Sequence, residues 1–378
     1  MMQQKAEDAT NTYTFVGWTP ELASVTGDVT YTAVFKAVAK LSNVIVYNNR
    51  TLLLEELVQV RYMFTLSGSF TKAELENNFG LLVWRGDDVK DGQNYVYETA
   101  TDVIEGIAVY GSGVYYVDGY GIPAHKLGDE MIARAYYKNS KGEYEYSKTI
   151  NYNPVKYAKS ILGASGATYE AMHPLMVSMM NYGAAAQAQF GYKTDAMMNS
   201  WLTDAQRALT KYDASQTQSL IKGTDKLKIE ATLNHTDRVK TLQVEDNIWM
   251  KFKYKFAEDV SKATELKLVH WSQEAYQNAT ELTLENATGS EDMVLNGGYY
   301  EGVIKGVPPK NNGWTYYACV YAKFADGTEC YSKLTTYSIH SYANSIITYP
   351  TGYTDELIDL CKAIINYSHD AYVYFGKK

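Results

Sequence analysis

The sequence predicts a mainly β protein with some α-helix: two tandem Ig-like β-sandwich modules, each followed by an amphipathic helix, after an N-terminal partial β-repeat. Three observations predict this fold class. An internal repeat recurs at a constant spacing of 185 residues. Short alternating runs with frequent turn signals precede the end of each repeat, as in sandwiches. Each repeat then changes to helical spacing of its apolar residues.

The N-terminal segment reads as a β-hairpin within residues 1–40. Two alternating runs, Tyr13–Trp18 and Val29–Val38, flank a connection that contains Pro, Gly and Asp. Gly27-Asp28 marks the turn into the second run. Two strands alone are too few to be stable in water, so we expect this segment to be part of something larger.

The internal repeat defines the two modules. Residues 113–191 align without gaps with residues 298–376, and 23 of the 79 aligned positions are identical. Upstream of this block the match continues loosely. We therefore expect one module at 41–192 and a second at 223–378, joined by a helical linker at 193–222 in which Thr203 and Gln206 form a capping box.

Turns and helices inside the modules follow from local signals. Lys141-Gly142 and Asp326-Gly327 predict hairpin turns between tyrosine-rich strands. One apolar stripe at 4-3-4-3-4 spacing predicts a helix at the end of each module. The stripe residues are Met172, Met176, Met179, Gly183, Ala186 and Phe190 in the first module and Leu357, Cys361, Ile364, Ser368, Ala371 and Phe375 in the second.

The N-terminal runs resemble the Listeria–Bacteroides repeat, the B-repeat type of internalin B. The resemblance rests on Phe15-Val16-Gly17-Trp18-Thr19-Pro20 and on Gly27-Asp28-Val29-Thr30-Tyr31-Thr32-Ala33. It covers the second half of such a repeat, so it implies that the chain begins inside one. Because that family belongs to large secreted or surface-attached bacterial proteins, the resemblance also implies an extracellular or cell-surface location, with the export signal in a missing upstream part.

A second resemblance covers the remainder of the chain. The stretch Asn181-Tyr182-Gly183-Ala184-Ala185-Ala186-Gln187, followed by Phe190-Gly191-Tyr192, resembles segments near the C-termini of large surface proteins of gut Firmicutes. It implies a location and membership in a larger polypeptide, and it implies no particular activity.

Composition narrows the class of function. The chain has 378 residues and a formal net charge of −8, which argues against a nucleic-acid partner or a polybasic membrane binder. No apolar run is long enough for a transmembrane segment. The unusual count is tyrosine, with 35 residues. Tyrosine combines a flat apolar body with a polar tip, so it suits both β-strands and binding surfaces.

The sequence contains no HExxH or CxxC motif, no P-loop and no Rossmann glycine pattern, so we expect a non-enzymatic protein with no cofactor and no metal. Paired carboxylates of a glycosidase remain possible, because their pairing is spatial. Asp87, Asp91, Gly92 and Glu98 fit positions of an EF-hand loop, but Val89 occupies a ligand position. A solvated hairpin turn and a weak calcium site both remain open there.

Candidate ligand-binding residues come from consecutive tyrosines, which point to opposite faces of a strand. One of each pair can lie in the core while the other faces solvent or a partner. Strand filling is the alternative explanation. The candidates are Tyr115, Tyr116, Tyr136, Tyr137, Tyr299, Tyr300, Tyr316 and Tyr317.

The leading hypothesis is adhesion or recognition at a bacterial surface, with a host glycoprotein, immunoglobulin or glycan as partner. One alternative is a structural stalk or C-terminal spacer of a large surface protein. Another is an accessory carbohydrate-binding module of a missing enzyme. A coplanar row of exposed aromatic rings would favour a glycan, and a surface without any apolar patch would favour the stalk.

Overall fold

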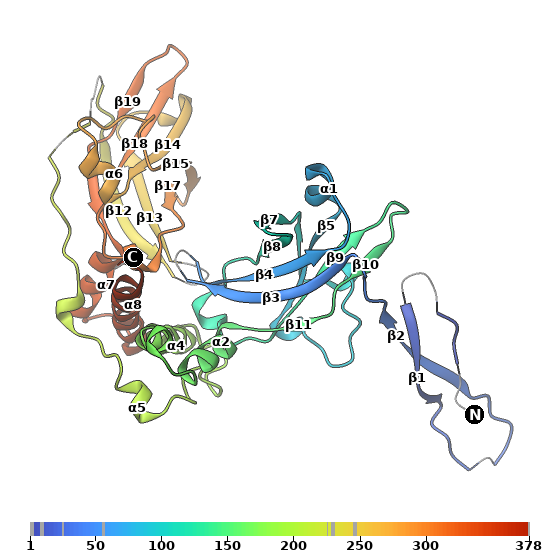
Figure 1. Ribbon diagram of the computed structural model, residues 1–378. Helices are drawn as coiled ribbons and strands as arrows, with labels where there is room; N and C mark the ends of the chain where they lie inside the picture. Colours follow the sequence, from blue (N-terminus) through green and yellow to red (C-terminus); the bar gives the residue numbers. More distant parts are fainter. Residues whose placement is uncertain are drawn as a thin grey trace. The chain divides into compact units, whose positions relative to one another are not determined.

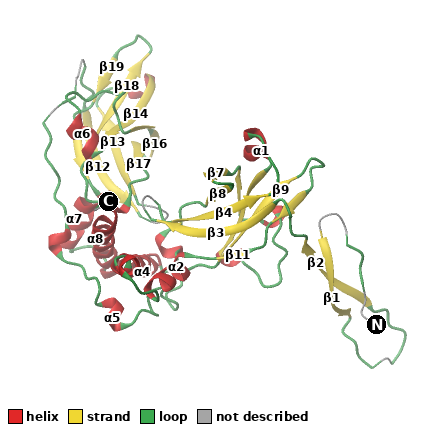
Figure 2. Cartoon of the chain, viewed as in Figure 1, coloured by secondary structure: helices red, strands yellow, loops and turns green. Residues whose placement is uncertain are grey.

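The computed structural model describes residues 4–7, 11–24, 26–54, 57–224, 226–227, 231–244 and 248–376. Parts of the predicted hairpin at 8–10 and 25, and the predicted module end at 377–378, lie outside the described residues. The described chain forms 20 strands in five antiparallel sheets, together with helices. The predicted fold class is therefore confirmed (Figures 1 and 2).

The N-terminal hairpin consists of β1 (Asn11–Thr19) and β2 (Thr32–Ala39), paired antiparallel. Phe15 packs edge-on against Trp18 and against Phe35, in both cases with ring centroids 5.6 Å apart. The two predicted strands are present, and these three rings supply the apolar side of the hairpin.

The first sandwich has two sheets, one with the strand order β3-β4-β8-β7 and one with the order β10-β9-β5-β6, where β11 also pairs with β9. In the lettering of immunoglobulin-type domains these orders are A-B-E-D and G-F-C-C′. The strands are β3 (Ile45–Leu53), β4 (Gln59–Leu66), β5 (Phe79–Arg85), β6 (Asp102–Glu105), β7 (Ala108–Gly111), β8 (Val114–Asp118), β9 (Met131–Lys138), β10 (Tyr144–Tyr146) and β11 (Ile150–Asn151).

The second sandwich has the same strand order, β12-β13-β17-β16 and β19-β18-β14-β15, with β20 paired to β18. Its two sheets meet at Gly302, where a Cβ atom would lie 2.6 Å from the Leu268 side chain of the facing sheet. The strands are β12 (His235–Gln243), β13 (Trp249–Phe256), β14 (Ala263–Trp271), β15 (Gly289–Asp292), β16 (Val294–Asn296), β17 (Tyr299–Ile304), β18 (Tyr316–Phe324), β19 (Glu329–Tyr331) and β20 (Thr335–Tyr337).

Each sandwich also buries the outer face of one sheet. In the first, Trp84 on β5 packs with Tyr136 on β9 under the segment 86–101. In the second, Trp271 packs with Tyr317 under the segment 273–287. The indole N–H of each tryptophan donates to a group 15 residues further along, the Thr99 carbonyl or the Asn286 side chain. The connection between C and C′ thus covers the sheet in both repeats.

The hairpin glycines and the buried serines at equivalent positions of the two repeats adopt the same local structure. Gly142 and Gly327 take positive φ values of 79° and 88° in the β9–β10 and β18–β19 turns, as predicted. Buried Ser147 accepts a hydrogen bond of 3.0 Å from the Ala135 N–H. The equivalent Ser332 accepts one of 2.8 Å from the Val320 N–H. These hydrogen bonds join strand F to the residue that directly follows strand G in each repeat.

Helices lie before, between and after the strands. The predicted stripes form α4 and α8, and the predicted capping box of Thr203 and Gln206 caps α5. The helices are α1 (Lys72–Asn77), α2 (Pro154–Leu162), α3 (Ala167–Glu170), α4 (His173–Phe190), α5 (Asp204–Arg207), α6 (Gln273–Asn278), α7 (Ile339–Thr348) and α8 (Asp355–Phe375).

Helices α4 and α8 pack against each other (Figure 2). Between them Tyr182 stacks on its repeat equivalent Tyr367, with ring centroids 5.5 Å apart and ring planes 12° from parallel. Each helix also contacts a short 3-10 turn of its own repeat, Ala124–Lys126 for α4 and Pro309–Asn311 for α8. The C-terminal helices of the two repeats therefore pack against each other, with equivalent tyrosines in contact.

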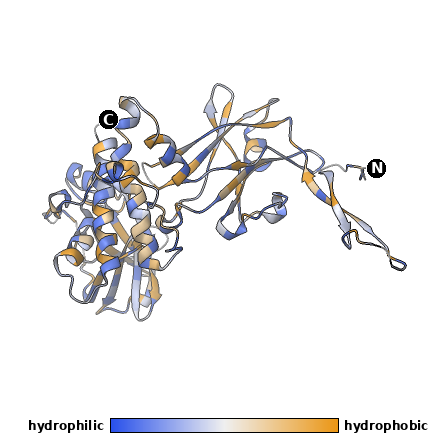
Figure 3. Cartoon of the chain, turned by 90° about the horizontal axis from the view of Figure 1, so that it is seen from below, coloured by the Kyte–Doolittle hydropathy of each residue, from blue (hydrophilic) through white to orange (hydrophobic). Residues whose placement is uncertain are grey.

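The compact units of the chain do not follow the sequence repeat. One unit comprises Met1–Leu52, Gln59–Tyr120 and Asp129–Tyr157, and the other comprises Leu53–Val58, Gly121–Gly128 and Ala158–Lys378. Helix α4 ends the first repeat but belongs to the second unit together with α8. Among the described residues no helix has the length and apolarity needed to span a membrane, and the helices in Figure 3 carry both hydrophilic and hydrophobic residues.

The Tyr182–Tyr367 stack gives a stability prediction. The Tyr367 ring is buried, and its hydroxyl has no hydrogen-bond partner among the residues that the structure describes. Tyr367→Ala should lower the free energy of unfolding by about 3 kcal/mol, because it leaves a cavity. Tyr367→Phe should be neutral or stabilising, because it removes only an unsatisfied hydroxyl. Urea unfolding measures both, and equal losses in the two variants would contradict this packing.

Two buried histidines predict loss of stability in acid. Burial lowers the pKa of His270 to about 4, and burial with nearby His369 lowers the pKa of His340 to about 4. Between that value and the unfolded pKa of about 6.5 the folded state binds fewer protons than the unfolded state. The free energy of unfolding should therefore fall as the pH drops from 6.5 to 4, which urea unfolding at several pH values measures.

The matched variants are His270→Gln and His340→Gln, which should show a smaller loss over the same pH range than the unchanged chain. His173→Gln serves as the control, because His173 is only half buried. Buried Asp370, whose pKa burial raises, works in the opposite direction. Variants must therefore be compared with one another, and identical pH profiles in all of them would refute the role of the two histidines.

Candidate functional site

An open groove of about 510 Å³ lies on the first sandwich, where the chain crosses from strand C′ to strand D. Helix α1, the end of β6, the start of β7 and the end of β8 form its walls. Its lining residues are Lys72, Leu75, Glu76, Ile104, Glu105, Gly106, Ile107, Ala108, Val109, Tyr116, Val117 and Asp118.

The shape of this groove depends on how α1 is held. Thr71 and Glu74 form a reciprocal capping box at the start of the helix, and hydrogen bonds from Thr71 lower the pKa of Glu74. The Ile107 N–H donates to the Leu75 carbonyl at 3.0 Å. Gly106 has φ of 80°, and a Cβ atom there would lie 3.3 Å from the Glu76 carbonyl oxygen. A glycine is required where the crossing passes under α1.

Tyr116 is the aromatic residue of the groove. The Arg61 guanidinium lies over its ring at 4.1 Å and holds Asp118 with two hydrogen bonds of 2.6 and 2.7 Å. Tyr110 meets Tyr116 edge-on, with ring centroids 6.1 Å apart and ring planes 85° from parallel. The two rings therefore do not form a coplanar row.

Next to the groove, β7 is an edge strand that exposes apolar side chains. Val109 is 63% exposed and Tyr110 is 61% exposed. In the second sandwich the equivalent edge strand β16 carries Val294 and Leu295, which are 66% and 61% exposed. Each of these residues lies 185 positions from its counterpart, so both repeats present an apolar pair on strand D.

Three of the eight candidate tyrosines lie in the core. Tyr136, Tyr316 and Tyr317 are 3%, 6% and 0% exposed. Tyr317 stacks on Tyr276 at 3.6 Å, and its hydroxyl donates to the Ile221 carbonyl. The segments that cover the outer face of the sheet bury Tyr136 and Tyr317. Tyr316 points to the opposite face of β18, where its ring lies 6.2 Å from that of His270. Burial keeps all three side chains from a surface ligand.

The other five candidates remain partly accessible. Tyr137 stacks on Phe79, and Tyr115 lies opposite Val109 in the β7–β8 pairing. Tyr299 donates to the Asp237 carboxylate, and Tyr300 lies 6.0 Å from the Phe256 ring. Only Tyr116 lines the groove. The structure therefore does not bring the accessible tyrosines together into one site.

The segment with the partial EF-hand pattern is not a helix–loop–helix. Gly86–Asp88 and Tyr97–Thr99 are short 3-10 turns within the segment that covers Trp84. Asp88 accepts a hydrogen bond from Thr101 at 2.9 Å. Within the described part of the chain, no group of three or more His, Cys, Asp or Glu side chains is arranged to hold a metal ion.

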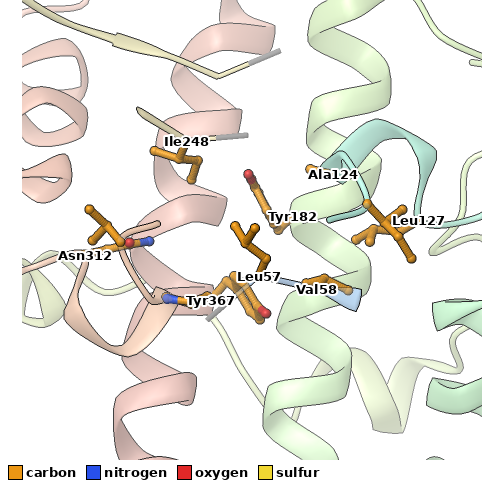
Figure 4. Close-up of a pocket in the computed structure, with 11 residues that line it drawn as sticks. Leu57, Val58, Ala124, Leu127, Tyr182, Ile248, Asn312 and Tyr367 are labelled. Atoms are coloured by element: carbon orange, nitrogen blue, oxygen red, sulfur yellow. The ribbon is translucent and has the colours of Figure 1, made fainter. Parts of the chain in front are cut away.

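A second cavity lies at the Tyr182–Tyr367 stack and measures about 50 Å³ (Figure 4). It is lined by equivalent pairs from the two repeats, including Ile122 with Val307 and Leu127 with Asn312. This volume holds no more than a few water molecules, so the cavity is part of the packing between repeats.

No family model matches the chain, and no curated protein is significantly similar to it. Among solved structures, the crystal structure of the chicken CNTN1 FN1-FN3 domains aligns with 82% of this chain and 70% of that chain. The sequence identity is 9% and the TM-score is 0.17. At that TM-score the likeness carries no argument, so the fold assignment rests on the strand order of the two sandwiches.

The apolar pairs on the D strands were missed by sequence reasoning. The signal was available, because the constant spacing of 185 residues extends upstream of residue 113 to Val109 and Val294. What the sequence alone could not show is that these short strands lie at sheet edges.

Proposed function

We propose that this chain is part of an extracellular bacterial surface protein that binds a protein partner, without catalysis, through the apolar edge strands of its two sandwiches. The observation that carries the proposal is the exposed pair Val109-Tyr110 and its repeat equivalent Val294-Leu295. The outer side of an edge strand offers unpaired N–H and C=O groups, which an extended segment of a partner can bind.

A protein is favoured over a glycan by the arrangement of the accessible rings. Glycan recognition by stacking needs a flat face, whereas Tyr110 and Tyr116 meet edge-on. Val109, Val294 and Leu295 offer aliphatic surface, which suits side chains of a protein segment. Since each edge strand is short, one contact alone would be weak, and two equivalent edges in one chain raise the overall avidity.

Three carboxylates line the groove, Glu76, Glu105 and Asp118, and the pairing of two of them supports a non-enzymatic role. Asp118 is held by Arg61, and Glu76 forms an ion pair with Lys72 at 3.6 Å. A general acid or base must be free to exchange its proton with a substrate. These two carboxylates instead position neighbouring cations.

The location is supported by the two resemblances, to the B-repeat type of internalin B and to C-terminal segments of large surface proteins of gut Firmicutes. Host glycoproteins and immunoglobulins are therefore the partners to test first. The exposed apolar pairs weigh against the second candidate, a stalk or spacer, because a spacer gains nothing from exposing them.

The test is capture by the immobilised chain from human intestinal secretions, with identification by mass spectrometry and a sugar-competition arm. Each identified protein is then purified and its binding measured against variants. Val109→Lys combined with Val294→Lys should weaken binding at least tenfold, because lysine blocks strand edges. Each single variant should retain part of the avidity.

The control is Val46→Lys combined with Val239→Lys, two exposed valines on the A strands. These variants should bind as the unchanged chain does. Binding that free sugars abolish would replace the protein partner by a glycan. Binding unchanged in the D-strand variants, or no capture at all, would reject the proposal and favour the spacer.

A further inference from the structure

The second sandwich carries a cationic groove of about 490 Å³ that is separate from the D-strand edges. Its lining residues come from the segment 222–224, from β12, from Tyr317 on β18 and from the segment 333–336. Strand β12 is the opposite edge of the sheet from β16. The inference drawn from this groove therefore does not depend on the proposed function.

Four cations converge on the groove: Lys222, Arg238, Lys240 and Lys333. No carboxylate lines it, and no ion pair joins any of the four to an acidic side chain in the described part of the chain. Like charges at short range repel one another, and among the described residues no ion pair offsets this repulsion. In a chain with a net charge of −8 such a concentration of positive charge is unexpected.

The surrounding atoms hold the groove in place. The Lys240 ammonium donates to the Thr336 carbonyl at 2.8 Å and lies 5.2 Å from the centre of the Tyr337 ring. The Ile221 N–H donates to the Thr315 hydroxyl at 2.8 Å, and its carbonyl accepts from the Tyr317 hydroxyl. Lys222 therefore follows an anchored residue, and Lys240 is fixed on the wall of the groove.

The positive field of the groove acts on its neighbours. Burial and the charges of Arg238 and Lys333 lower the pKa of nearby His235. Burial and the Arg238 charge lower the pKa of Lys240. Burial is the larger cause of both shifts, and neighbouring positive charge is the smaller one, which a bound anion would offset.

We propose that this groove is a binding site for an oxyanion group: sulfate, phosphate or carboxylate. Charge-assisted hydrogen bonds from Arg238 and the lysines would hold the anion, as in other oxyanion sites. The Thr224, Thr335 and Thr336 side chains add hydroxyl groups at the rim. At the repeat spacing the first sandwich keeps a lysine, Lys148, in the place of Lys333, but it has Ile150 and Asn151 in place of Thr335 and Thr336, so it lacks these two hydroxyl groups.

Two sources can supply such an oxyanion, a free inorganic ion or an acidic saccharide. Calorimetric titration of the full chain with sodium sulfate, sodium phosphate, glucuronate and a sulfated heparin disaccharide separates them. Sodium chloride at matched ionic strength is the reference. Direct titration is needed, since sulfate stabilises proteins in general by exclusion from their surface. Disaccharide binding tenfold tighter than inorganic sulfate identifies a saccharide, and equal binding identifies a free ion.

The test variant is Arg238→Gln combined with Lys333→Gln, which should raise the Kd for the tightest probe at least tenfold. Lys262→Gln is the control, because Lys262 is exposed, pairs with Asp259 and lies outside the groove. Without ligand, thermal unfolding of the control should match that of the unchanged chain, and the double variant should be at least as stable, because it removes two of the four mutually repelling charges. The proposal fails if no probe binds more tightly than chloride, or if the double variant binds as the control does.

Discussion

The covering of the G-F-C-C′ sheet on its outer side is the constraint on which the rest of the structure depends. Trp84 and Trp271 lie on that outer side, and each is tied by its indole N–H to the segment that covers it. An ordinary sandwich leaves this face to solvent, whereas here it is a second apolar layer in each repeat. The sheet is therefore buried on both faces, and burial of its tyrosines adds to the core.

This constraint decides where recognition can take place. With the outer face covered, what remains for partners is the edge strands and the grooves beside them. The covering segment ends at β6 and β15, directly before the crossing to strand D. The groove at Tyr116 and the apolar pairs on β7 and β16 both arise at that crossing. The two repeats share the exposed edge but differ beside it, since Glu301 takes the place of Tyr116 and pairs with Lys253 at 2.7 Å.

Much of this fold could be predicted from the sequence because its signals are local or repeated. Glycines in the hairpin turns, the capping box at Thr203 and the helical stripes each depend on neighbours a few residues away. The faces of the tyrosine-rich strands could not be assigned in this way. A period of two places Tyr136 and Tyr137 on opposite faces, but it does not say that a distant segment covers one of them. The cationic groove was also beyond prediction, because Lys222, Arg238 and Lys333 come from three separated segments.

The stack of Tyr182 on Tyr367 has a consequence for how the two repeats associate. Tyr182 stacks on the equivalent tyrosine of the other repeat. Helix α4 contacts the 3-10 turn of the first repeat, and α8 contacts the equivalent turn of the second. Equivalent elements thus make equivalent contacts, as they do in an isologous interface. The helical surface of each repeat is therefore complementary to the helical surface of the other. Because both copies belong to one chain, this contact is intramolecular and needs no second molecule. The two copies have also diverged, as Glu301 in the place of Tyr116 illustrates.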